Sequence, residues 1–257
     1  MKITFLGTGT SQGVPVIGCN CRVCRSTDPR DNRLRSSILV EWSGNRFVVD
    51  CGPDFRQQML RYSVNTIDAI LVTHGHKDHL GGLDDVRAFN YFLKKPTDVY
   101  ASKEVQKTIR REYAYAFEKE PYPGVPEISL HSLSSKPFLL NGLPVIPVRA
   151  THFNNRHFVY GFRFADFTYI TDAVKISKKE KEKIRGSKVI VLNALRKERH
   201  YSHFSLEEAL DLMAELKPEQ GYLTHISHQM GLYSEVSPLL PYFVQLASDG
   251  LAVTVSE

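Results

Sequence analysis

The sequence predicts an α/β (α+β) protein in which two mixed β-sheets pack face to face, with helices on the outside. Two observations lead to this prediction. Short apolar strands dominate each half of the 257-residue chain, and helical segments follow them in each half. Because a sheet buries its apolar face against another layer, two such sets favour a layered sandwich. The chain shows no repeat, low-complexity stretch or linker, so we expect one domain over residues 1–257.

The first half supplies the first set of strands. They are predicted by runs of β-branched and aromatic residues that Gly, Ser or Asn residues bound. We expect these strands at 2–6, 36–42, 46–50, 69–73 and 98–102. The Ser-Gly-Asn segment at 43–45 predicts a hairpin between the second and third strands. Helices are expected at 55–61 and 103–117, and a proline-rich loop at 118–127.

The second half repeats the pattern. Strands are expected at 144–148, 158–164, 167–171, 189–194, 221–226 and 251–255. Three helices are expected at 177–185, 205–216 and 237–247. Ser177 is a suitable N-cap for the first of these helices, and Ser205 with Glu208 fits a capping box on the second.

Charge and hydropathy say little about function. Lys and Arg number 33 against 28 Asp and Glu, and the resulting charge of +5 is compatible with an anionic substrate without indicating one. No apolar run is long enough to span a membrane, and residues 1–9 read directly into a strand and turn. We therefore expect a soluble, cytoplasmic protein.

One loop concentrates metal-binding side chains. The predicted strand at 69–73 ends in the sequence His-Gly-His-Lys-Asp-His, which carries His74, His76, Asp78 and His79. Imidazole and carboxylate groups are good ligands for Zn, Mn or Fe. We expect His74 and His76 to converge on one ion, and Asp78 and His79 to turn toward a second. Solvated histidines in a polar turn are a much less probable interpretation of three His and one Asp in six positions.

One loop cannot complete two sites, so further ligands are expected at other strand ends. His152, Asp172 and His225 each follow a predicted strand. Each is a weak signal alone, since a single His after a strand is usually an ordinary loop residue. Together they supply two imidazoles and a carboxylate, which can bridge two cations.

At this point the sequence resembles the metallo-β-lactamase superfamily. The resemblance spans nearly the whole chain through FLGTGTS, VVDCGPDFR, LVTHGHKDHLGGL, THF, YITDA and LTHISHQ. It implies an αββα sandwich with a two-metal site, of Mn or Zn, at one sheet edge. In this resemblance His74, His76 and His152 hold one ion. Asp78, His79 and His225 hold the other, and Asp172 bridges the two. Asp50 resembles the carboxylate that orients ligands of the first loop, although it could equally cap its own turn.

A second metal site is predicted near the N-terminus. Cys19, Cys21 and Cys24 are too close together for an ordinary disulfide framework, and His228 is the best candidate for a fourth ligand. This pattern resembles the phosphodiesterase branch that includes the carbon–phosphorus lyase accessory enzyme, where such a cluster binds a structural zinc. Three free thiols in an exposed loop are the alternative. Cys51 lies outside this cluster and is expected to be buried.

A proton donor is expected just before the predicted helix at 205–216. The phosphodiesterase and tRNA-processing branches place a catalytic histidine 22 residues ahead of the last metal histidine, and His203 has this spacing from His225. His200 is a weaker candidate for a substrate contact. From the residues alone, either could flank the helix without a chemical role. An aromatic segment at 113–122 could form a lid over the site or simply pack a helix onto its sheet.

The resemblance therefore implies a metal-dependent phosphoric diester hydrolase. We expect it to cleave small cyclic or nucleotide phosphodiesters by attack of a metal-bridged hydroxide, with Asp78 accepting or orienting the proton. The expected partner is a small anionic substrate, nucleic acid and membranes are not expected, and a homodimer is suggested by resemblance only. The alternatives are a tRNA 3′-end processing endonuclease and a non-hydrolytic cofactor-biosynthesis protein of the same fold.

Overall fold

Two β-sheets form the centre of the computed structural model, which describes residues 1–153 and 157–255. The first sheet has seven strands in the spatial order β15 (Ala252–Thr254), β1 (Lys2–Gly7), β2 (Ser37–Trp42), β3 (Asn45–Val49), β4 (Ala69–Leu71), β5 (Thr97–Ala101) and β6 (Ile128–Ser132). Strands β3 to β6 run parallel, whereas β15, β1, β2 and β3 pair antiparallel.

The second sheet follows the order β11 (Lys175–Ile176), β8 (Leu143–Phe153), β9 (His157–Phe164), β10 (Phe167–Ile170), β12 (Val189–Asn193), β13 (Gln220–Thr224) and β14 (Val244–Leu246). Strand β7 (Phe138–Leu140) pairs with β8 outside this path. Strands β10, β12, β13 and β14 are parallel, so their carboxyl ends meet at one edge of the sheet.

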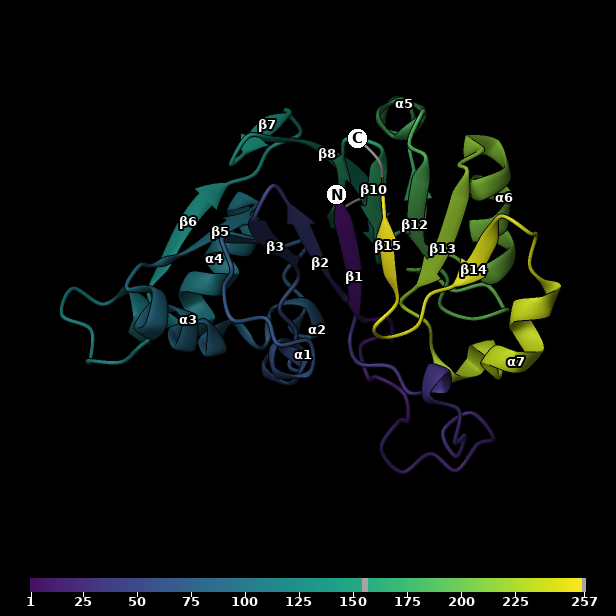
Figure 1. Cartoon of the computed structure of the whole chain (residues 1–257), viewed down its shortest axis with the longest axis horizontal. Coiled ribbons are helices and arrows are strands. Elements are labelled where there is room, and N and C mark those ends of the chain that lie inside the picture. The colour runs from purple at the N-terminus through teal and green to yellow at the C-terminus, as the bar shows by residue number, and fades with distance from the viewer. Residues whose placement is uncertain (154–156, 256–257) are drawn as a thin grey trace.

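Helices cover the outer face of each sheet (Figure 1). Beside the first sheet lie α1 (Phe55–Arg61), α2 (Lys77–Leu80), α3 (Val86–Leu93) and α4 (Lys103–Glu112). Beside the second sheet lie α5 (Lys178–Ile184), α6 (Leu206–Leu216) and α7 (Tyr233–Val236). Short 3₁₀ turns occur at Pro29–Asp31, Leu83–Asp85, Ala114–Phe117, His228–Met230 and Ser237–Leu239. No described helix has the length and apolar character needed to cross a membrane.

Three apolar clusters hold these layers together. One lies between the sheets and includes Phe5, Phe47, Phe162 and Tyr169, all fully buried. A second packs the second sheet against its helices, and a third packs the first sheet against α1, α3 and α4. The expected sandwich of two sheets with outer helices is therefore confirmed.

Most of the predicted strands and helices are found close to their expected ranges. The hairpin between β2 and β3 is confirmed: Ser43 and Gly44 both have positive φ, as the tight primed turn of a twisted hairpin requires. The predicted helix at 237–247 is wrong. A 3₁₀ turn occupies Ser237–Leu239 and β14 occupies Val244–Leu246, because Pro241 cannot donate a helical hydrogen bond. The helix expected to reach 117 ends at Glu112, and a 3₁₀ turn follows.

Candidate metal centre and active site

The candidate site lies where the carboxyl ends of strands from both sheets meet. Asp50 directly follows β3, Asp172 lies two residues after β10, and His225 directly follows β13. All three adopt the left-handed backbone conformation, with φ of 65°, 58° and 55°. This conformation is uncommon for residues other than glycine, and it clusters at functional sites. Each strand therefore turns sharply at the residue that enters the site.

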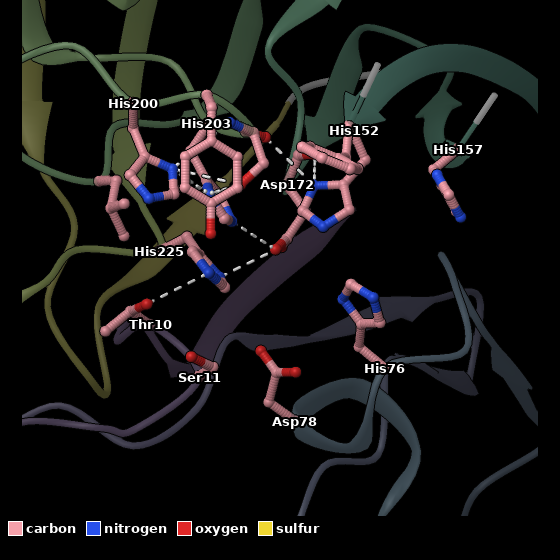
Figure 2. A pocket seen from close by; sticks show the side chains of 14 residues that line it. Thr10, Ser11, His76, Asp78, His152, His157, Asp172, His200, His203 and His225 are labelled. Carbon is pink, nitrogen blue, oxygen red and sulfur yellow. Dashed lines mark hydrogen bonds and ion pairs between the residues drawn. The ribbon is translucent and has the colours of Figure 1, made fainter. Parts of the chain in front are cut away.

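A close approach of two loops fixes the histidine-rich segment in place. A Cβ atom on Gly52 would lie 1.9 Å from the backbone oxygen of Asp78, so only glycine fits there. The backbone N–H of Cys51 donates to the carbonyl of His79 at 2.9 Å. The start of α2 is thereby held against the loop after β3. As a result, Asp78 and His79 are buried, and Figure 2 shows the side chains of Asp78 and His76 both directed into the cavity.

The first donor cluster consists of His74, His76 and His152. The Thr73 hydroxyl donates to Asp50, so its oxygen accepts from Nδ1–H of His74 at 3.0 Å. This leaves the lone pair of His74 Nε2 facing His76 Nδ1, 3.0 Å away. His152 Nδ1 donates to the backbone carbonyl of Asp172 at 2.6 Å, which leaves its Nε2 free to act as a ligand.

The second donor cluster consists of Asp78, His79, Asp172 and His225, all buried. His79 Nε2 lies 3.1 Å from Asp78 Oδ2 and 3.2 Å from Asp172 Oδ2. His225 Nδ1 also lies 3.2 Å from Asp172 Oδ2. Asp172 belongs to this cluster and also groups with His152 of the first cluster and with His203, so it lies between the two groups of ligands.

The chemistry of these donors fits a cation. His79 Nδ1–H donates to Asp50 Oδ2 at 2.7 Å, which leaves the Nε2 lone pair facing two carboxylate oxygens. Among the described residues, neither His79 Nε2 nor His225 Nδ1 has a hydrogen-bond partner although both atoms are buried. Such orphaned polar atoms are costly unless an ion or a proton binds them. A divalent ion between these atoms would satisfy all of them together.

The electrostatics of the cluster also favour a bound cation. Burial lowers the pKa of His225 to about 4 and lowers the pKa values of His74 and His152, so these imidazoles are neutral ligands at pH 7. Burial alone would also lower the pKa of His79, but the carboxylates of Asp78, Asp172 and Asp50 raise it well above its usual value. A positive charge is therefore favoured at His79, and either a proton or a metal ion can supply it.

Asp50 supports the first loop from behind. Its carboxylate is fully buried and accepts hydrogen bonds from the Thr73 backbone N–H at 2.8 Å, the Thr73 hydroxyl and His79 Nδ1. These contacts match the predicted orienting role. The alternative was that Asp50 caps the turn before Gly52. Among the described hydrogen bonds, its carboxylate makes none with the backbone of that turn.

His203 lies beside both donor clusters. Its Nε2 lies 2.9 Å from Asp172 Oδ1, and its Nδ1 lies 2.9 Å from the Ser202 hydroxyl and 3.1 Å from His200 Nδ1. The predicted capping box of α6 is confirmed, with both reciprocal hydrogen bonds between Ser205 and Glu208. This box fixes the loop that carries His203 against the site.

One open cavity of about 550 Å³ contains most of these groups (Figure 2). It also exposes several residues that the sequence did not single out: Thr10, Ser11, Phe153, His157, Tyr201 and Ser202. A second cavity of about 610 Å³ shares His76, His152 and His157 with the first. The aromatic segment at 113–122 lines neither cavity. The Tyr113 hydroxyl donates to the Leu80 carbonyl and this side chain is buried, so Tyr113 packs onto the fold, whereas Tyr115 and Tyr122 are exposed.

The predicted cysteine cluster also comes together. His228 Nδ1 lies 3.2, 3.4 and 3.5 Å from the sulfurs of Cys19, Cys21 and Cys24. Zinc bonds of about 2.0 Å to nitrogen and about 2.3 Å to sulfur at a tetrahedral angle need N···S distances of about 3.5 Å. The Cys24 backbone N–H donates to the Cys21 sulfur and lowers the pKa of that thiol to about 6. Cys51 is buried elsewhere, as predicted.

The predicted ligands of each ion thus lie within reach of one another. Their role as metal ligands stays a prediction that this grouping supports. The same holds for His203 as proton donor. His200 lines the cavity and is close to His203, as a substrate contact would be.

Comparisons with known proteins bear on the family. A model of the beta-lactamase superfamily domain matches residues 45–226. An octanoyltransferase of Porphyromonas gingivalis (strain ATCC BAA-308 / W83) is 38% identical over 260 residues, which are 100% of this chain and 52% of that protein. The chain thus spans about half the length of this curated relative, so the activity named for the whole relative does not pass to this chain.

Two solved structures are similar over their full length. The crystal structure of a new diphosphatase from the PhnP family has a TM-score of 0.92 and 37% identity, and the match covers 99% of this chain and 98% of that one. Zn²⁺-bound PqqB from Methylobacterium extorquens has a TM-score of 0.80 with 18% identity, covering 99% and 100% of the two chains. At this lower identity the likeness shows the fold alone. The chain therefore belongs to the beta-lactamase superfamily, within its PhnP family.

Proposed function

We propose that this protein is a metal-dependent hydrolase of small phosphodiesters, or of the P–O–P anhydride bond of a diphosphate that carries an ester group. The observation that carries the proposal is the position of Asp172. It belongs to a buried donor cluster, contacts His203 through its other oxygen, and lines an open cavity. The likeness to a diphosphatase over nearly the whole chain supports chemistry at phosphorus.

The residues divide into ligands for two ions. His74, His76 and His152 would hold one ion, and Asp78, His79 and His225 would hold the other, with Asp172 shared between them. Two bound divalent ions would polarise the phosphoryl group. They would also lower the pKa of bound water, so that hydroxide would be available at neutral pH. Manganese and zinc both suit this mixture of imidazole and carboxylate ligands.

The remaining chemistry belongs to the protein. Burial would raise the pKa of Asp78, but nearby His79 outweighs it and holds the pKa well below its usual value. Its carboxylate is thus ionised and can orient the attacking water in the cavity. His203 lines the cavity and its Nε2 lies 2.9 Å from Asp172 Oδ1, so a leaving oxygen bound next to this carboxylate would be within its reach. A proton donated at this atom would neutralise the departing alkoxide or phosphate.

Two other functions compete with this one. A tRNA 3′-end endonuclease would share the metal chemistry, but residues 1–257 contain no glycine-rich basic insertion that could grip tRNA. A non-hydrolytic binding protein of the same fold would tolerate loss of catalytic ligands. Here all seven predicted ligand positions carry a His or Asp and lie together, which favours catalysis.

The test is the initial rate of bis(4-nitrophenyl) phosphate hydrolysis by the Mn²⁺-reconstituted protein. We expect turnover that Asp78→Ala abolishes and Asp84→Ala retains. Asp84 is a matched control because its carboxylate contacts Tyr115 and Arg87 and lines neither cavity. No turnover by protein that holds both ions would reject the proposal, and precursor tRNA would then be the next substrate to assay.

A further inference from the structure

Aromatic rings line the outer part of the cavity that contains the candidate metal centre. Tyr201 and Phe153 both line it, and they keep 72% and 41% of their surface exposed. The rings of His200 and His157 adjoin them, and Figure 2 shows these two histidines on opposite sides of the cavity. The cavity is thus polar where the donor clusters meet and aromatic at its mouth.

Two neighbouring rings contact the ring of Tyr201. Its ring lies over that of His200, with centroids 4.2 Å apart and planes at 31°. Phe153 meets it edge to face at 5.4 Å and 78°. The adjacent Ser202 and Phe204 are buried, so the backbone on this side is anchored. A tyrosine side chain has only two χ angles, so it loses little conformational freedom when a ligand stacks on it.

Exposed aromatic rings elsewhere on the protein do not share this setting. Tyr91, Phe92, Tyr122 and Tyr242 are more than 60% exposed, but none of them lines this cavity. An aromatic ring exposed to water lacks the favourable free energy that burial of its apolar surface would give. A planar ligand group that stacks on the ring at the mouth of this cavity would bury that surface and gain this free energy.

We propose that Tyr201 and Phe153 form a stacking surface for a nucleobase, so that the substrate is a nucleotide ester or diphosphate. This inference rests on the proposed function, because it places the phosphate of the same ligand at the metal centre. A nucleotide joins an anionic group to a planar ring within one small molecule. The cavity of about 550 Å³ falls within the range of roughly 300–1,000 Å³ that is usual for small ligands.

The experiment compares two ligands that differ only in the base. Adenosine 5′-monophosphate and ribose 5-phosphate are both phosphate monoesters, so they engage the metal centre alike. Their dissociation constants are measured by isothermal titration calorimetry on the metal-loaded protein. We expect the nucleotide to bind between about 5-fold and about 150-fold more tightly, which corresponds to base stacking worth about 1–3 kcal/mol.

Variants then assign the difference to one ring. Tyr201→Ala should remove most of the preference while leaving the affinity for ribose 5-phosphate within about twofold of the wild type. Tyr201→Phe keeps the ring and should keep the preference. Tyr242→Ala is the matched control, since this tyrosine is 97% exposed and lines neither cavity near the metal centre. It should change neither constant.

Three results would overturn the inference. They are equal binding of both ligands by the wild type, equal weakening of both by Tyr201→Ala, and no binding of the nucleotide. Because calorimetry needs no turnover, these results are independent of the rate assay for phosphodiester hydrolysis. Failure of that assay together with a base preference that depends on Tyr201 would reject the proposed reaction and retain the nucleotide site.

Discussion

His203 Nε2 lies 2.9 Å from Asp172 Oδ1, while Asp172 Oδ2 lies 3.2 Å from the ring nitrogens of His79 and His225. One carboxylate therefore uses one oxygen for the candidate proton donor and the other for the donor cluster. His203 is not one of the four donors of that cluster, although its ring nitrogen also groups with donor atoms of His152 and Asp172. The two roles can thus be separated by mutation.

His203→Ala should lower kcat by roughly 10²–10⁴-fold, the usual contribution of a positioned acid or base, with little change in bound metal. Metal content is measured by inductively coupled plasma mass spectrometry, and kcat is measured with the chromogenic diester. His131→Ala serves as the control, because His131 pairs with Asp98 and lines neither cavity near the centre. An unchanged kcat would remove His203 from the mechanism.

Asp50 gives a second prediction, on metal affinity. Asp50→Asn introduces an amide N–H₂ among three donors: the two of Thr73 and Nδ1–H of His79. The tautomer of His79 that offers Nε2 to a metal is then no longer enforced. We expect metal affinity to fall by roughly 10–100-fold, as for other groups that orient metal-binding histidines. Asparagine tolerates the left-handed backbone at this position, so the turn is preserved.

Competition with a chromophoric chelator measures this loss of affinity. Asp98→Asn is the matched control, since it removes a carboxylate from a half-exposed ion pair with His131. An Asp50→Asn protein that binds metal within twofold of the wild type would show that Asp50 has no orienting role.

The cysteine cluster provides a third prediction. Cys24→Ala should lose one zinc per chain, and Cys51→Ala should retain it, because Cys51 is buried outside the cluster. With zinc at roughly 1,000 times its Kd, linkage makes bound zinc worth about 4 kcal/mol, which corresponds to a Tm change on the order of 10 °C. Zinc content and thermal unfolding are measured on both variants. Equal zinc content in the two would contradict a site at Cys19, Cys21, Cys24 and His228.

The sequence predicted which metal-donor side chains lie together better than it predicted the residues around them, for a physical reason. Metal donors are chemically distinctive, so residues such as His152 and His225 can be recognised although they lie 73 positions apart. Aromatic residues serve packing and binding equally well. Neither Phe153, which the sequence placed only within the THF motif, nor Tyr201 was predicted to line the site until the fold placed them 5.4 Å apart. The aromatic segment at 113–122 was considered as a lid, but it lines neither cavity. At 237–247 the prediction relied on an apolar run and disregarded Pro241, so the predicted helix was wrong.

The last prediction concerns the pH dependence of stability, which we expect to reflect the ionisation of Asp249. This carboxylate is almost completely buried and accepts hydrogen bonds from the Thr8 hydroxyl and the Leu34 backbone N–H, both at 2.7 Å. Arg61 lies 3.8 Å away, and buried Arg33 hydrogen-bonds the same Thr8 oxygen. Burial raises the pKa of Asp249 to about 6, against the opposing effect of these hydrogen bonds and cations.

The sign follows from proton binding. The unfolded chain releases the Asp249 proton near pH 4, but the folded protein keeps it until about pH 6. The folded state therefore binds more protons within this window, and its stability falls as pH rises from about 4 to about 6. Above about pH 6 the ionised, buried Asp249 lowers the free energy of unfolding by about 3 kcal/mol in full.

Urea unfolding at pH 4, 5, 6 and 7 should show the wild type losing stability relative to Asp249→Asn, which has no proton to release. Asp166→Asn removes a partly exposed partner of Lys188 and should leave the wild-type slope unchanged. Parallel stability curves for the wild type and Asp249→Asn would mean that Asp249 is already ionised at pH 4, stabilised by Arg33 and Arg61 more strongly than burial opposes it.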